Sequence, residues 1–106
     1  MIFSGKFTRK NVYQVFKDGE IFSPDRSLAI RNHSPTGFSW GYNGSGCAQL
    51  ALAILLEVTD RVTAEQLYQD YKRSVTSMLP DTWKLDSEDV REWLKTARTT
   101  DVDEVS

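Results

Sequence analysis

The hydrophobic residues change their spacing about a third of the way along the chain, and this change predicts an α+β domain. In the first third, β-prone residues form short runs, as in NVYQVFKDGEIF over residues 11–22. Asp18 and Gly19 separate two of these runs, and a type I′ hairpin turn needs the positive φ angles that Asp-Gly adopts at low cost. Leu28 and Ile30 alternate with other residues in SLAIRN, which predicts a further short strand.

The segment FSWGY alternates as well. Phe38, Trp40 and Tyr42 are separated by Ser39 and Gly41, so an extended backbone would place the three rings on one face of a strand. The favoured role for these rings is packing in the core. Stacking on nucleic-acid bases is the alternative, but platforms of that kind combine the rings with basic residues, and Ser39 and Gly41 are not basic.

A helical pattern begins near residue 47. Residues 47–58 are almost entirely apolar, which is typical of a central, buried helix. Ser45 or Gly46 is expected to cap this helix. Gln49 lies in its first turn, and we expect its side chain to bond the free amides there or the preceding loop rather than a ligand.

Two amphipathic helices are expected to follow. Thr63 and Gln66 have the spacing of a capping box, and Val62 and Leu67 have the spacing of a hydrophobic staple. Asp86 is expected to cap the last helix. The apolar stripes are Ala64, Leu67, Tyr68, Tyr71, Val75 and Met78 in the first of these helices, and Val90, Trp93, Leu94 and Ala97 in the second.

These elements predict a small antiparallel sheet, made of the N-terminal hairpin and one or two further strands, packed on three helices. Residues 1–98 are expected to form this single α+β domain. Residues 99–106 are small, acidic and without period, which predicts a flexible tail.

Composition narrows the class of protein. The chain has 106 residues, a net charge of −2 and one cysteine, so it cannot form an internal disulfide. Its longest apolar run, Leu50–Leu56, is far shorter than the ~20 residues of a membrane span. The first ten residues lack the apolar core of a signal peptide. We therefore expect a cytoplasmic protein that does not contact membranes.

The charge is unevenly distributed. Residues 1–53 hold six Lys/Arg and three Asp/Glu, a balance of +3, whereas residues 54–106 hold seven and twelve, a balance of −5. Solvated helix faces account for most of this difference. The basic cluster of Lys6, Arg9 and Lys10 is short, and it keeps nucleic-acid binding as a less favoured alternative.

The glycine-rich loop is the first candidate site. Gly41 and Gly46 satisfy the G-x-x-x-x-G part of a phosphate-binding loop, but Cys47 and Ala48 stand where the motif requires Lys and Ser/Thr. Nucleotide hydrolysis is therefore not expected. A tight turn into the buried helix is the favoured interpretation, and an anion site at the helix N-terminus is the alternative. The loop residues concerned are Asn43, Gly44, Ser45, Gly46 and Cys47.

Catalytic and metal sites have few candidate residues. Cys47 lies at a helix N-terminus, which can lower a thiol pKa, and His33 is the only available histidine base. Nothing in the sequence indicates that the two meet. One Cys and one His cannot supply a four-ligand zinc site. We assign no catalytic residue, no metal and no cofactor.

The stretch RNHSPTGFSWGYNGSGCAQLALAILLEVT, residues 31–59, together with LYQDYKRSV, residues 67–75, resembles a family of short, functionally unassigned proteins from bacteria, archaea and their phages. Their shared stretch reads approximately His-Ser-Pro-x-Gly-Phe-x-Trp-Gly-Tyr-x-Gly-Ser-Gly-x-Ala-Gln-Leu-Ala-Leu. The resemblance runs from the Asp18-Gly19 turn to Trp93 and implies no established activity. Members often have proline at the position of Cys47, which implies a turn rather than a required thiol.

The leading functional hypothesis is a non-enzymatic module that binds a protein partner. The occurrence of the family in phages implies an inhibitor of a host protein, such as a defence protein. A small enzyme or ligand-binding protein that uses the glycine loop and Cys47 is the alternative, and a nucleic-acid-binding protein is the second. The expected docking face consists of Glu65, Asp70, Lys72, Arg73, Glu88, Arg91, Glu92 and Lys95.

Overall fold

The fold is built around a four-stranded antiparallel sheet. The computed structural model describes residues 1–10, 12–35 and 37–105, with side chains described up to residue 97. The strands lie in the order β3-β2-β1-β4, so β1 is an interior strand between β2 and β4. Their bounds are Ile2–Phe7 for β1, Tyr13–Lys17 for β2, Glu20–Ile21 for β3 and Thr82–Asp86 for β4.

The predicted hairpin is confirmed. Asp18 and Gly19 have φ angles of 50° and 84°, as a type I′ turn requires, and they join β2 to β3. The strand β4 was not predicted. Its Trp83 lies opposite Gly5 of β1, where any Cβ would overlap the indole ring. Gly5 therefore makes room for the tryptophan inside the sheet–helix interface.

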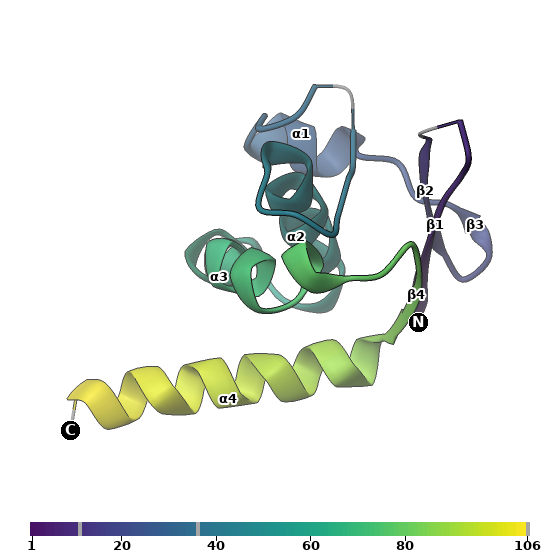
Figure 1. Ribbon diagram of the computed structural model, residues 1–106. Helices are drawn as coiled ribbons and strands as arrows, with labels where there is room; N and C mark the ends of the chain where they lie inside the picture. The colour runs from purple at the N-terminus through teal and green to yellow at the C-terminus, as the bar shows by residue number, and fades with distance from the viewer. Residues whose placement is uncertain (11, 36, 106) are drawn as a thin grey trace.

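The helices lie on one side of the sheet, which Figure 1 shows nearly edge-on. The predicted α+β class is confirmed. The long helix α4 leads away from the end of β4. The bounds are Asp25–Ile30 for α1, Ser45–Val58 for α2, Arg61–Ser74 for α3, Thr76–Met78 for the 3₁₀ helix η1 and Ser87–Val105 for α4.

The core surrounds α2, which is buried without interruption from Gly46 to Leu56. Phe3 and Trp83 contribute from the sheet, and both are buried. Tyr71 of α3 packs edge-on against Trp93 of α4, with their ring centroids 4.8 Å apart. The prediction of a central, apolar helix is therefore confirmed, with a start two residues earlier than Cys47 and Gly44 as its N-cap.

The predicted strand in SLAIRN is wrong, because its first four residues, Ser27 to Ile30, belong to the helix α1. Pro24 stands at its N-cap, and its carbonyl accepts hydrogen bonds from the Leu28 amide and the Ser27 hydroxyl, both at 2.9 Å. Two alternating apolar residues are too few to separate a strand from a short helix. The fixed φ of proline at a helix start decides for the helix here.

The predicted strand in FSWGY is also wrong. Gly37 and Gly41 have φ angles of 111° and 81°, which turn the backbone before Phe38 and after Trp40. The Gly41 amide and the Trp40 indole donate to carbonyls of the segment between α3 and β4, those of Thr76 and Pro80. FSWGY is therefore a loop that is held against the connection between α3 and β4 and does not belong to the sheet.

Asp60, not Thr63, caps α3. Its carboxylate accepts the Thr63 amide at 2.8 Å, and the helix begins at Arg61. The capping box and the staple are therefore wrong, and Val62 is exposed. Met78 is exposed as well, because α3 ends at Ser74.

The predicted cap of α4 is confirmed. The Asp86 carboxylate accepts the Glu88 amide at 3.0 Å, and the Asp89 carboxylate accepts the Asp86 amide at 3.3 Å. The helix continues to Val105, past the end expected near residue 98. The side chains of residues 98–105, and Ser106 altogether, lie outside the described part of the chain, so the flexibility of residues 99–106 stays a prediction.

Candidate functional site

The glycine-rich loop leads directly into α2. Gly44 is the N-cap of that helix, and no side chain caps it. Asn43 and Ser45 are exposed, whereas Gly46 is buried against Ser39, whose side chain would overlap any Cβ at this position. The tight approach of the loop to α2 therefore requires glycine at position 46, in agreement with the favoured interpretation of a turn.

Two adjacent depressions lie beside this loop and share Tyr13, Gly37 and Phe38. One, with a volume of about 210 Å³, is the aromatic pocket, whose walls include Tyr13, Val15, Ile21, Phe22, Pro24 and Phe38. The other, of about 490 Å³, is the serine hollow, and its walls include Val12, Ser34, Ser39, Tyr42, Ser45 and Gly46. We call the two together the groove.

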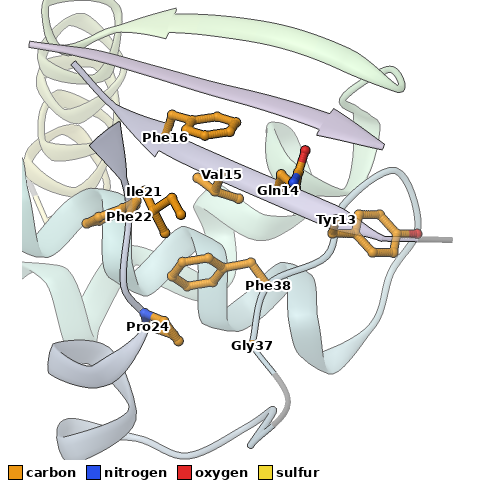
Figure 2. A pocket seen from close by; sticks show the side chains of 9 residues that line it. All are labelled: Tyr13, Gln14, Val15, Phe16, Ile21, Phe22, Pro24, Gly37 and Phe38. Carbon is orange, nitrogen blue, oxygen red and sulfur yellow. The ribbon is translucent and has the colours of Figure 1, made fainter. Parts of the chain in front are cut away.

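The aromatic pocket lies between the β2–β3 hairpin and the loop that carries Phe38, as Figure 2 shows. The Phe38 ring packs on Phe22 with their centroids 5.6 Å apart, and Phe22 packs on Phe3 of the core at 5.7 Å. Ile21 at its rim is 84% exposed. The pocket thus has a wall anchored to the core and an apolar rim open to solvent.

The serine hollow has a different chemistry. The hydroxyls of Ser39 and Tyr42 lie 3.0 Å apart and bond each other. Tyr42 is 52% exposed, so the expectation that all three motif aromatics are used in the core is wrong for this ring. Ser34 is only 8% exposed, and its hydroxyl has no hydrogen-bond partner among the residues that the structure describes. The hollow therefore offers polar groups next to the N-terminus of α2.

Gln49 fixes the position of Ser34. The Gln49 side-chain oxygen accepts the amides of His33 and Ser34 at 2.8 and 3.3 Å. Its side-chain nitrogen donates to the Ser27 hydroxyl of α1 at 2.8 Å. Gln49 is fully buried, and its bonds go to the preceding chain, as expected. The wall of the hollow is thus attached to the core helix.

His33 and Cys47 are each bonded to a different residue. The His33 ring lies 2.7 Å from the Tyr68 hydroxyl, and the Cys47 thiol donates to the Tyr42 carbonyl at 2.6 Å. Cys47 is fully buried and does not line the groove. The thiol is therefore enclosed and bonded to the backbone, which does not favour a nucleophilic role.

Tyr13 joins the two depressions and has a shifted pKa. Burial raises the pKa of the Tyr13 hydroxyl, and the nearby Tyr42, Cys47 and Asp81 raise it further. The hydroxyl therefore remains protonated well into the alkaline range. At neutral pH the shared wall of the groove presents a neutral donor.

Most charged residues of the expected docking face form pairs along their own helices. Arg73 pairs with Asp70 at 2.8 Å and Lys95 with Glu92 at 3.4 Å, and Arg91 pairs with Glu88. Glu65 pairs with Arg61 of α3 and with Arg31 next to α1, each at 3.2 Å, and Lys72 is half-buried. Such exposed pairs neutralise each other and contribute little energy.

The described residues were also compared with the requirements of a metal site and of a membrane-spanning helix. Among the described residues, no three His, Cys, Asp or Glu side chains lie together in a way that could hold a metal ion. None of the helices, as far as they are described, is long and apolar enough to cross a membrane.

The family model for a family of unknown function (DUF6166) matches residues 3–96. The chain belongs to this family. This DUF6166 chain matches no curated protein and no solved structure. The expectation of a functionally unassigned family is confirmed, and the groove has to be interpreted from its own chemistry.

The glycine loop could be found from the sequence, but most of the groove could not. Val12, Tyr13 and Ile21 come from the hairpin, and only the fold brings them beside Ser34 and Phe38. One signal was available. Ile21 follows the hairpin turn in a two-residue edge strand, a position where a large apolar side chain has little chance of burial.

Proposed function

We propose that this DUF6166 protein is a small, non-enzymatic binding module that holds a partner protein in the groove. One observation carries the proposal. Six large hydrophobic side chains are exposed among the described residues, and three of them, Val12, Ile21 and Tyr42, belong to the walls of the groove. Exposed apolar side chains gathered at a depression are typical of interaction sites.

The groove supports this function better than the charged faces of α3 and α4. Most charges on those faces have a partner on the same helix, so docking there would compete with existing ion pairs. The groove combines half-buried aromatic rings with free polar groups, which is the composition of energetically important interface centres. That the partner is a host defence protein, inhibited by a phage or mobile-element product, stays a hypothesis from the resemblance.

Capture from a cell lysate on the immobilised chain tests the proposal. The double variant Val12→Ser with Ile21→Ser removes two exposed apolar groups from the groove and should fold, since neither side chain is buried. We expect it to lose the partner that the parent retains, as measured by quantitative mass spectrometry.

The matched control is Val62→Ser with Met78→Ser, which makes a comparable change at two exposed residues outside the groove. This control should capture the partner as the parent does. If the groove variant still captures it, or if charge reversal at Arg91 and Lys95 abolishes capture instead, the groove is not the docking site.

Nucleic-acid binding has one observation in its favour. The sheet face away from the helices carries exposed Lys6 and Lys84, with half-buried Phe16 in the same row as Lys84. An aromatic ring on the same face as cations suits a single-stranded nucleic acid. A mobility shift of labelled single-stranded DNA or RNA that is lost in Lys84→Glu would favour this second function.

A further inference from the structure

The N-terminus of α2 opens into the serine hollow. Ser45 and Gly46 are the first two residues of a 14-residue helix, and both line the hollow. Their amides cannot bond within the helix, and no described residue accepts them. No acidic residue lies in the first turn of α2. The positive end of the helix dipole therefore faces the hollow without a counter-charge.

Ser34 provides an independent indication of a ligand at the same place. Among the described residues, the indole nitrogen of Trp83 is the buried side-chain polar atom that lacks a partner, so the unpaired Ser34 hydroxyl is not sealed off from solvent. Ser34 is only 8% exposed and lines the hollow. Its hydroxyl has no partner among the described residues. Gln49 accepts the Ser34 amide, which holds the backbone of this residue beside the hollow. The hydroxyl is thus available to an acceptor in the hollow.

The adjoining aromatic pocket suits one apolar side chain. Its volume of about 210 Å³ exceeds the roughly 150 Å³ of an apolar cavity that accommodates benzene. Since Tyr13, Gly37 and Phe38 belong to both depressions, a ligand that fills both must carry its acceptor group next to its apolar group.

We propose that the groove binds the carboxyl terminus of a partner polypeptide whose last residue is apolar. The terminal carboxylate accepts hydrogen bonds from the Ser45 and Gly46 amides and from the Ser34 hydroxyl, and the last side chain enters the aromatic pocket. This inference rests on the proposed function and specifies its partner.

The chemistry favours a chain end over other anions. In a C-terminal residue the carboxylate and the side chain leave the same Cα atom, which matches two depressions that share a wall. Inorganic phosphate has no apolar group for the pocket. An acidic side chain within a peptide needs space for the chain to continue on both sides. Capture of a terminal carboxylate by backbone amides is an established mode of peptide recognition.

Two immobilised peptide pools test the proposal. Both are attached through their N-termini and randomised at the last four positions, and one ends in a free carboxylate while the other ends in an amide. We expect at least tenfold more of the chain on the free-acid pool. Sequencing of the retained peptides should show apolar last residues. Equal retention on the two pools would overturn the carboxylate site, and polar last residues would overturn the role of the aromatic pocket.

A pair of variants at Ser45 tests the position of the carboxylate. Ser45→Asp adds a negative charge where an acidic residue favours the helix, so the chain should fold at least as well as the parent. The free-acid pool should retain at least tenfold less of this variant than of the parent. Ser45→Asn has a similar size and no charge, and it should retain most of the binding. Equal binding by Ser45→Asp and Ser45→Asn would overturn the site.

The outcomes separate this inference from the proposed function. If the two pools are retained equally while Val12→Ser with Ile21→Ser still loses the lysate partner, the groove is a docking site for another part of a protein. If inorganic phosphate displaces the retained chain as well as a free-acid peptide of the selected sequence does, the hollow binds small anions and the chain-end proposal is wrong. Loss of peptide binding in Ser34→Ala, with an unchanged melting temperature, would support it.

Discussion

Single buried side chains determine whether the groove exists. Gln49 is the clearest case, because it joins α1, the turn at His33 and Ser34, and α2 through three hydrogen bonds. The bonds to the Ser34 amide and the Ser27 hydroxyl are buried, and the bond to the His33 amide is partly buried. A residue of this kind contributes less through the bonds it makes than through the unpaired amides it would leave behind.

We expect Gln49→Leu to destabilise the domain by about 2–4 kcal/mol, because two partly buried amides lose their acceptor. Urea unfolding followed by circular dichroism measures this loss. Gln66→Leu makes the same chemical change at an exposed position of α3 and should stay within about 0.5 kcal/mol of the parent. A Gln49→Leu variant as stable as the parent would show that the network is not important for the fold.

Tyr71 makes the stability depend on alkaline pH. Burial raises its pKa above the ordinary value of 10.0, and Asp89 raises it further. The unfolded tyrosine therefore ionises first, so its stabilising effect is fully present below about pH 10 and falls as the pH rises above that value. The loss approaches about 1.4 kcal/mol per pH unit while the folded form stays protonated.

The variant Tyr71→Phe keeps the ring against Trp93 and removes the ionisable group. Urea unfolding at pH 9, 10 and 11 should show a steeper loss of stability in the parent than in this variant. The control is Tyr42→Phe, which removes a hydroxyl from an exposed ring and leaves the buried one in place. Parallel curves for the parent and Tyr71→Phe would contradict the assignment.

At the scale of elements, α4 packs on the domain through residues in its first part. Among the residues of α4 whose side chains are described, up to residue 97, Ser87, Val90 and Leu94 are buried, and Trp93 and Ala97 are half-buried. We expect deletion of residues 100–106 to lower the melting temperature by less than about 2 °C, on a scale of about 4–8 °C per kcal/mol for a domain of this size. Thermal melts test this. A larger decrease would mean that Val102 or Val105 packs on the body or on a second molecule.

The sequence predicted the elements whose local signals agree with their surroundings. The hairpin has a turn that only a few dipeptides can form, and α2 has an apolar pattern that only a central helix can bury. FSWGY failed because the positive φ angles of Gly37 and Gly41 outweigh its alternation. The strand β4 was missed because it is only five residues long, ends on the helix cap Asp86 and pairs only with β1, about 80 residues earlier.

At the scale of the molecule, the candidate site is a property of the fold rather than of a motif. The glycine loop was recognised as a candidate, but its neighbours in the groove come from β2, β3 and the turn at Ser34. Nothing in the local sequence relates Ile21 to Phe38. The charged residues of α3 and α4, by contrast, were conspicuous in the sequence because i,i+3 pairs are a local pattern.

The position of β1 between β2 and β4 also has a consequence for biosynthesis. Ile2 pairs with Asp86, so the sheet cannot be completed until the ribosome has made the residues in between. At about 5–20 residues per second, this takes roughly 4–17 s. During that time one edge of β1 has no partner strand, and such an edge can pair with other chains. The nascent chain is therefore most exposed to aggregation, and most dependent on chaperones, before its last strand emerges.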